Sequence, residues 1–224
     1  MPNDAPEVKR VGTLKNGAQI ISYDRTKEDR EAICLKLVEE KKMKLIPPFD
    51  YFDVIAGQGT AAKELFEEVG ELDYLFVCCG GAGLLSGSAI AAKELSPNCK
   101  VYGVEPQAGN DGQKSFRTGA IVKIATPITI ADGAQTQAIG KLPFEIIKNC
   151  GNIADIVTVT DDELITCLKF FANSLKIVVE PTGCLGLAGV LFGGIDLSSS
   201  RVGVIVSGGN VDMCKYIEFL SSSN

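Results

Sequence analysis

The residue types best suited to chemistry form a glycine-rich run, Cys79-Gly80-Gly81-Ala82-Gly83-Leu84, directly after the apolar segment Tyr74–Cys78. Small residues let consecutive backbone N–H groups point at one ligand, and a helix that begins there adds the positive end of its dipole. Both features favour an anion, above all a phosphate group. The run therefore predicts a phosphate-binding loop between a buried strand and a helix.

Three interpretations of this loop are open from the residues alone. Gly81-Ala82-Gly83, with Glu105 at the end of the next apolar segment, is similar to a dinucleotide fingerprint, although Ser86 stands where that fingerprint has Gly or Ala. Alternatively, the loop holds a single terminal phosphate, such as that of a vitamin B6 cofactor. The third interpretation is a tight strand-to-helix turn without a ligand, which needs fewer small residues than this loop contains.

Composition excludes several classes of protein. The chain of 224 residues has a net charge of −6 and no tryptophan, which argues against a nucleic-acid partner, because phosphate backbones bind clustered basic surfaces. The absence of histidine rules out a Ser-His-Asp triad, a Cys-His dyad and a histidine-ligated zinc site. Any chemistry must therefore use a cofactor, lysine, serine or carboxylate groups.

The sequence also indicates a compartment. Residues 1–6 lack the apolar core of a secretory signal, and the longest small and apolar stretch, Cys184–Phe192, is too short to cross a bilayer. The eight cysteines include no C-x-x-C pair and fall mostly in apolar segments, where a free cysteine behaves as a small buried hydrophobe. We therefore expect a reduced, cytoplasmic protein without a membrane partner.

Alternating strands and helices predict an α/β fold with an open, twisted parallel sheet flanked by helices. The expected strands are 18–23, 74–79, 100–104, 177–179 and 202–206, and the expected helices are 26–41, 61–69, 86–95, 161–175, 182–191 and 211–220. Thr60 is the expected N-cap of the helix at 61–69, and Thr160 opens a capping box with Glu163. Pro47-Pro48 interrupts the pattern and predicts a boundary between residues 1–49 and 50–224.

Motifs along the whole chain are more specific. In order, they are Gly57-Gln58-Gly59-Thr60, Gly80-Gly81-Ala82-Gly83-Leu84, Val104-Glu105-Pro106, Thr129-Ile130-Ala131-Asp132-Gly133-Ala134, Glu180-Pro181-Thr182-Gly183 and Ser207-Gly208-Gly209-Asn210. This set resembles the fold-type II pyridoxal-phosphate (PLP) enzymes of the serine racemase and serine/threonine dehydratase group. Ile130–Gln135 and Val179–Gly186 are most similar to the 3-hydroxyaspartate dehydratase branch.

The resemblance implies a phosphate site at the glycine loop. Gly80, Gly81, Ala82, Gly83 and Leu84 match the loop whose backbone N–H groups bind the cofactor phosphate, and Ala82 replaces the family's usual third glycine. Its methyl group would be strained if this position requires a positive φ.

The resemblance places three further residues around the cofactor ring. Ser207 matches the hydroxyl that faces the pyridine nitrogen, Glu180 lies in a turn near the ring, and Gly133 matches a backbone carbonyl beside the cofactor hydroxyl. A neutral hydroxyl leaves that nitrogen unprotonated and favours elimination of a β-hydroxyl group. Taken alone, Ser207 also suits the N-cap of a helix, and Glu180 suits the end of a strand.

The resemblance also implies a cation site and a nucleotide site. Glu105, Gly109 and Asp111 match a divalent-cation site, where two carboxylates and one backbone carbonyl suit Mg²⁺ or Ca²⁺. Without the family context, solvated loop carboxylates explain the same residues. Lys176 and Asn210 match positions at which some members bind a nucleotide effector.

Two family motifs have no match in this sequence. They are the Schiff-base lysine, in a Ser-Phe-Lys-like segment, and the Ser-Gly-Asn-His loop that binds the substrate carboxylate. Relative to the family, the chain is thus N-terminally truncated, and we expect no catalytic residue in it. Residues 1–49 match a remnant of the small, substrate-side domain, and residues 50–224 match an incomplete large, cofactor-binding domain.

The implied activity belongs to the intact protein. The resemblance implies dehydration and deamination, or racemisation, of a small hydroxy-amino acid such as serine, threonine or 3-hydroxyaspartate, by a homodimer. We expect the 224 residues alone to be inactive. The alternatives are a non-catalytic remnant that binds PLP or a protein partner, and a nicotinamide-dependent enzyme that uses the glycine loop with Glu105.

Overall fold

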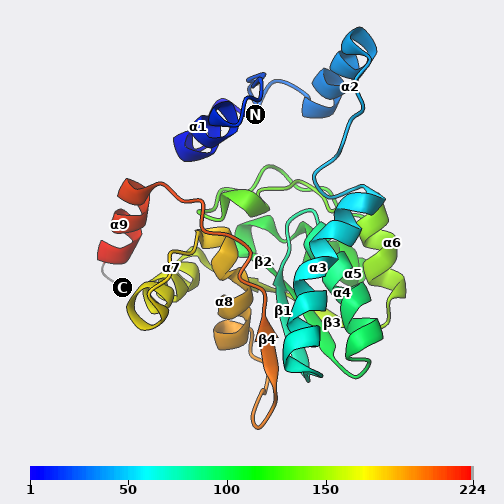
Figure 1. Cartoon of the computed structure of the whole chain (residues 1–224), viewed down its shortest axis with the longest axis vertical. Helices are drawn as coiled ribbons and strands as arrows, with labels where there is room; N and C mark the ends of the chain where they lie inside the picture. Colours follow the sequence, from blue (N-terminus) through cyan, green and yellow to red (C-terminus); the bar gives the residue numbers. More distant parts are fainter. Residues whose placement is uncertain (223–224) are drawn as a thin grey trace.

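The centre of the molecule is a parallel β-sheet. The computed structural model describes residues 1–222, and its strands are β1 (Tyr74–Cys78), β2 (Lys100–Pro106), β3 (Ile153–Val159) and β4 (Val202–Val204). They are hydrogen-bonded in the order β3-β2-β1-β4, and every pairing is parallel. The predicted open α/β sheet is confirmed, and the carboxyl ends of its strands share one edge (Figure 1).

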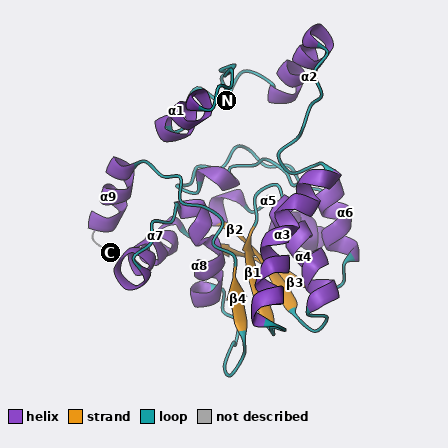
Figure 2. Cartoon of the chain, viewed as in Figure 1, coloured by secondary structure: helices purple, strands orange, loops and turns teal. Residues whose placement is uncertain are grey.

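Helices cover both faces of the sheet (Figure 2). One face carries α3 (Phe52–Val69), α4 (Gly83–Leu95) and α6 (Lys141–Asn149), and α5 (Asp111–Thr118) packs against β3. The other face carries α7 (Asp161–Phe170), α8 (Leu185–Phe192) and α9 (Met213–Ser221). Short 3₁₀ turns lie at 107–109, 132–134 and 181–184, and a π-helical turn lies at 171–175. No helix within residues 1–222 is both long and apolar enough to cross a membrane.

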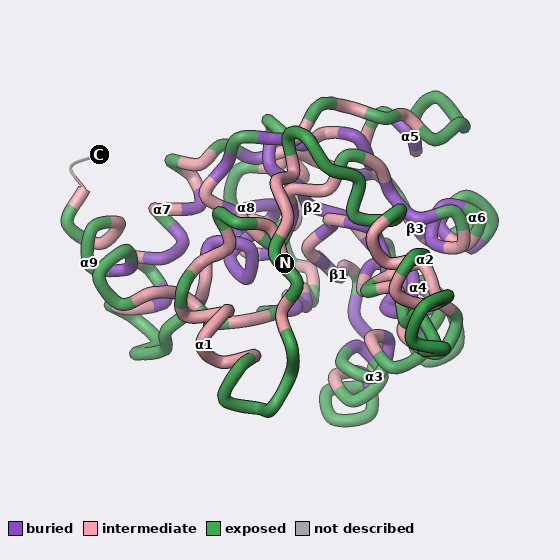
Figure 3. Tube along the Cα trace, turned by 90° about the horizontal axis from the view of Figure 1, so that it is seen from above, coloured by how far each residue is buried: buried purple, intermediate pink, exposed green. Residues whose placement is uncertain are grey.

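The hydrophobic core is divided in two by the sheet. Leu75 and Val77 are buried in a cluster with α3, α4 and α6, whereas Phe76, between them on β1, is buried in a cluster with α7 and α8. This alternation follows from the two-residue period of a strand. Figure 3 shows the buried segments gathered around the strands. A continuous apolar run such as β1 is therefore buried on both faces, as expected of a parallel sheet.

The prediction that α3 begins after Thr60 is wrong. The helix begins at Phe52 and runs through Gly57, Gly59 and Thr60 without a break. A Cβ added at Gly59 would lie 2.7 Å from the carbonyl oxygen of Gly87, and one added at Gly87 would lie 2.4 Å from that of Ile55. The glycines in this motif therefore allow α3 and α4 to pack with their backbones in contact.

The N-terminal arm (residues 1–46) lies outside the hydrophobic core. Its helices, α1 (Glu7–Lys15) and α2 (Arg30–Lys41), bury no residue, and Figures 1 and 3 place the arm over the carboxyl edge of the sheet. The strand expected at 18–23 is wrong, because only Tyr23 makes a bridge, to Pro2. Proline has no N–H group and cannot extend a ladder. The domain boundary at Pro47-Pro48 remains a prediction.

The sequence did not predict β3, α5 or α6, and the remaining differences are mainly at the ends of elements. The helix expected from residue 26 begins at Arg30, because Asp29 accepts hydrogen bonds from the first-turn N–H groups. No strand forms at 177–179, where the chain beyond the π-helical turn makes no ladder. The capping box is confirmed, since Thr160 and Glu163 exchange both hydrogen bonds at the start of α7.

Candidate functional site

The glycine loop joins β1 to α4 and leaves its backbone donors free. Within residues 1–222, the N–H groups of Gly80, Gly81, Ala82, Gly83 and Leu84 donate to no protein acceptor. Gly83 and Leu84 are the first residues of α4, where N–H groups have no partner inside the helix. Five consecutive free donors at a helix N-terminus fit a phosphate group, because its oxygens are charged acceptors.

Close packing explains why this loop needs glycine. A Cβ at Gly81 would lie 2.2 Å from Cγ of Phe49, and one at Gly83 would lie 2.3 Å from Oε1 of Gln58. Ala82 has a φ of +67°, so the strain predicted for a methyl group at this position is confirmed. The Phe49 ring therefore supports one side of the loop, and the loop's conformation is tightly determined.

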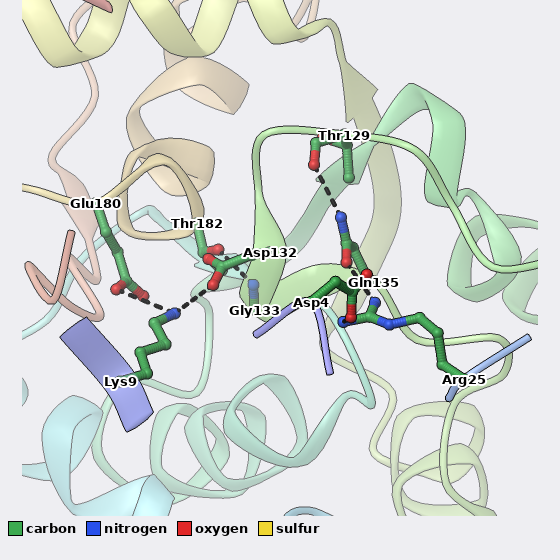
Figure 4. Close-up of polar contacts among 9 residues, drawn as sticks. All are labelled: Asp4, Lys9, Arg25, Thr129, Asp132, Gly133, Gln135, Glu180 and Thr182. Atoms are coloured by element: carbon green, nitrogen blue, oxygen red, sulfur yellow. Dashed lines mark hydrogen bonds and ion pairs between the residues drawn. The ribbon is translucent and has the colours of Figure 1, made fainter. Parts of the chain in front are cut away.

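Two more segments predicted from the sequence meet this loop. A Cβ at Gly80 would lie 3.1 Å from the carbonyl oxygen of Gly133, so the two loops are adjacent. The N–H group of Gly133 donates to Oγ1 of Thr182 at 3.0 Å, which joins this loop to the Glu180-Pro181-Thr182 turn (Figure 4). The structure thus brings together three motifs that are far apart in the sequence.

Ser207 lies beside the last residue of β1. Sγ of Cys78 donates to Oγ of Ser207 at 3.3 Å, and the N–H group of Glu180 donates to the carbonyl oxygen of Gly208 at 3.0 Å. Ser207 is not a helix cap, because Asp212 caps α9. The glycine loop, Gly133, Glu180 and Ser207 therefore surround one region at the carboxyl edge of the sheet.

Lys9 is a residue of this region that sequence reasoning missed. From α1, its Nζ lies 2.6 Å from Oδ2 of Asp132 and 3.6 Å from Oε2 of Glu180 (Figure 4). Arg25 makes a second connection from the arm, through Oε1 of Gln135 at 2.7 Å. No local signal could have identified Lys9, because 123 positions separate it from Asp132.

Lys9 opposes the effect of burial on Glu180. Burial raises the pKa of the Glu180 carboxyl, Lys9 lowers it, and Asp132 raises it again. We expect Lys9→Met to raise the pKa of Glu180 further, as measured by carbon-13 NMR titration of its carboxyl group. Since the folded-state pKa then exceeds the unfolded one by more, the variant loses additional stability as pH rises through the folded-state pKa.

Lys15→Met is the matched control for this prediction. Lys15 lies on the same helix but makes no ion pair within the described residues. An unchanged Glu180 titration in Lys9→Met, or an equal shift in both variants, would contradict the contact.

Glu105 and Asp111 form a buried carboxylate pair at the end of β2. Glu105 accepts hydrogen bonds from the N–H groups of Gly112 and Gln113, at 3.2 and 2.8 Å, and both acids are 1% exposed. The two oxygens of Asp111 have no hydrogen-bond partner. Burial raises the pKa of Glu105 to about 8 and that of Asp111 to about 7, and each carboxyl is unfavourable when charged without a cation.

This pair suits a hard cation but is not a complete ligand set. Within residues 1–222, no three acidic, histidine or cysteine side chains gather as a metal cluster. The expected third ligand is the carbonyl of Gly109, which is buried in the turn between β2 and α5. The solvated-carboxylate interpretation is wrong, because both side chains are almost fully buried.

Comparisons with known proteins identify the family. A family model described as pyridoxal-phosphate dependent enzyme matches residues 1–208. The chain is 60% identical to a serine racemase of Schizosaccharomyces pombe, over 99% of its own length and 68% of the relative's. The chain belongs to the pyridoxal-phosphate dependent enzymes. Within that family it falls in the group of serine racemases and 3-hydroxyaspartate ammonia-lyases, and the resemblance inferred from the motifs is confirmed.

Other relatives of this PLP family agree. An L-threo-3-hydroxyaspartate ammonia-lyase of Saccharomyces cerevisiae is 59% identical, over 99% of this chain and 67% of that protein. The crystal structure of serine racemase from Dictyostelium discoideum matches with a TM-score of 0.84 and 42% identity, over 95% of this chain and 68% of that one. The family assignment favours PLP over a dinucleotide as the cofactor.

Proposed function

We propose that the intact enzyme removes water and then ammonia from a small hydroxy-amino acid, such as serine, threonine or 3-hydroxyaspartate, or inverts its α-carbon. The observation that carries the proposal is the row of five free N–H groups beside Ser207, in a chain 60% identical to a protein named serine racemase. The relative named L-threo-3-hydroxyaspartate ammonia-lyase supports the elimination reaction.

The residues present fit PLP. When bound, PLP supplies an electron-withdrawing ring that stabilises negative charge at the α-carbon of an amino acid. The N–H groups of Gly80–Leu84 would hold its phosphate, and the carbonyl of Gly133 would lie beside its hydroxyl group. The Ser207 hydroxyl would face the ring nitrogen without protonating it, and the Glu180 turn would border the ring. None of these residues is a lysine, and none matches the family's Schiff-base position.

PLP binding by the 224-residue chain is the first test. Added PLP should raise its melting temperature, because a ligand that binds only the folded state stabilises it by mass action. NAD should not. Borohydride should fix no cofactor at the glycine loop, since no lysine matches the family's Schiff-base position, whereas exposed lysines react with free PLP to a low extent. Stabilisation by NAD alone would refute the proposal, and a stoichiometric adduct on one lysine, located by peptide mass mapping, would refute our expectation that this chain is inactive.

Identification of the substrate requires the protein purified from its native source. Its intact mass should be compared with 23.7 kDa, and its release of ammonia should be measured with L-serine, L-threonine and L-threo-3-hydroxyaspartate. Formation of D-serine would indicate racemisation. Release of ammonia from none of the three, with no D-serine, would exclude the proposed reaction. If PLP binds but no reaction occurs in either form, the non-catalytic PLP-binding remnant is the better interpretation.

We also propose that Glu105, Asp111 and the Gly109 carbonyl bind Mg²⁺ or Ca²⁺. The two unpartnered oxygens of Asp111 support this site. Either ion should raise the melting temperature of the unmodified chain but not of Asp111→Asn. Asp196→Asn, at an exposed aspartate, is the control and should keep the full response. An equal response in Asp111→Asn would place the ion elsewhere.

Three further proposals concern the cellular location, a nucleotide effector and the oligomeric state. The eight cysteines are all unpaired, which supports a reducing, cytoplasmic location. Lys176 and Asn210 are exposed on segments that run side by side, since the Glu180 N–H group bonds to Gly208, and this supports a nucleotide effector there. A homodimer is proposed from the family resemblance, and sedimentation of the native protein tests it.

A further inference from the structure

Ser207 stands where the chain leaves the sheet and loses its backbone partners. The N–H group of Ile205 still bonds to the carbonyl oxygen of Phe76, at 3.0 Å. Within the described residues, Ser207 itself makes no backbone hydrogen bond, and it is exposed. The contact that reaches its side chain is the hydrogen bond from Sγ of Cys78 at 3.3 Å. The direction of the Ser207 hydroxyl thus depends on this one contact.

We propose that Cys78 is a positioning residue that aims the hydroxyl of Ser207 at the cofactor's ring nitrogen. This inference rests on the proposed PLP site. A serine hydroxyl has one O–H donor and two lone pairs. When the thiol of Cys78 donates to one lone pair, the O–H of Ser207 remains free to donate to an unprotonated ring nitrogen. No proton is transferred in this arrangement, because both side chains stay neutral.

The position of Cys78 suits this role. It is the last residue of β1, and its backbone pairs with Val104 of β2, whereas the pairing of β1 with β4 ends at Phe76. Burial raises the pKa of its thiol, and Glu180 raises it further, so the thiol keeps its proton near neutral pH and remains a donor. The contact with Ser207 lowers that pKa but does not reverse the shift.

The neighbouring cysteine cannot take over this role. The side chain of Cys79 points to the other face of the sheet, where it belongs to the cluster with α3 and α4 and lies near Glu105 and Asp111. Alternation along β1 therefore presents only Cys78 to Ser207. One short segment, residues 78–84, carries both the thiol and the phosphate donors.

The test measures the PLP dissociation constant of the 224-residue chain and its variants. A second readout is the absorbance maximum of bound PLP. Cys78→Ala should weaken binding by about 3- to 10-fold, which is typical of one neutral hydrogen bond. Cys78→Ser, which restores a donor, should return it to within about 2-fold. In a Ser207→Ala background, Cys78→Ala should have no further effect. The absorbance maximum of bound PLP should shift in the same direction in Cys78→Ala and Ser207→Ala.

Cys99→Ala is the matched control. Cys99 is buried, whereas Cys78 is partly buried, and Cys99 precedes β2 at the opposite edge of the sheet, so PLP affinity should not change. If Cys78→Ala does not fold, Cys78→Val, which fills the space without a donor, takes its place.

The outcomes separate this inference from the proposed function. If the unmodified chain and Ser207→Ala differ in affinity but Cys78→Ala matches the unmodified chain, the inference is wrong and the PLP site stands. If Cys78→Ala lowers PLP affinity equally in the unmodified chain and in the Ser207→Ala background, the effect of Cys78 is one of packing, and the inference is wrong. If the unmodified chain does not bind PLP, both the inference and the proposed function fail.

Discussion

Gly81→Ala should weaken PLP binding by about 10- to 150-fold, the change expected when one hydrogen bond to a charged phosphate is lost. Its new Cβ would lie 2.2 Å from Cγ and 2.3 Å from Cδ1 of Phe49. Because Cγ is close to the stem of the side chain, rotation of the ring does not relieve the overlap. The loop must therefore move, and its N–H groups lose their common direction. Isothermal titration with PLP measures the effect.

A compensating substitution makes this prediction specific. The double variant Phe49→Ala/Gly81→Ala removes the obstructing ring and should recover most of the affinity. Gly57→Ala is the control for an added methyl group, because no atom lies within 4 Å of its new Cβ. Full affinity in Gly81→Ala would show that the Phe49 contact does not determine the loop's conformation.

Gly87→Ala should reduce the free energy of unfolding by about 3 kcal/mol, the upper part of the usual range for overpacking. The added Cβ would lie 2.4 Å from the carbonyl oxygen of Ile55 and 2.6 Å from the amide nitrogen of Gly59. Both atoms are backbone atoms of α3, so no side-chain rotation can relieve the contact. Helix α3 must move away from α4, which opens the core on that face. Urea unfolding measures the change.

Gly57→Ala is again the matched control. It lies in α3 between Ile55 and Gly59, which contact α4, and has nothing within 4 Å of a new Cβ. Alanine should stabilise the protein by about 0.5–1 kcal/mol, because glycine costs this much inside a helix. If Gly87→Ala and Gly57→Ala had the same effect, the close approach of α3 and α4 would be refuted.

These two variants perturb one continuous arrangement. Helix α4 starts at the glycine loop and packs against α3 four residues later, at Gly87. Gln58, on α3, also reaches the loop, where a Cβ at Gly83 would lie 2.3 Å from its Oε1. Gln58 and Gly59 therefore support the cofactor loop through packing, whereas Gly57 does not.

Local patterns in the sequence determined the central strands, the loop and the family. The apolar run at Tyr74–Cys78 and the small residues after it predict a strand, a loop and a helix, and the structure has these three elements, whereas phosphate binding by the loop stays a prediction. The capping box at Thr160 likewise depends on residues three positions apart. Such features need only neighbours along the chain, so the sequence displays them directly.

Only the tertiary structure decided features that depend on distant partners. The glycines at 57 and 59 predicted that the helix begins after them, but α3 continues through both because α4 packs against it. Residues 18–23 and 177–179 read as strands, but no neighbouring strand pairs with them. Cys78 meets Ser207 across 129 positions, and Lys9 meets Asp132 across 123. Strand pairing, helix packing and side-chain contacts each require a second segment, and a single stretch of sequence does not specify which segment that is.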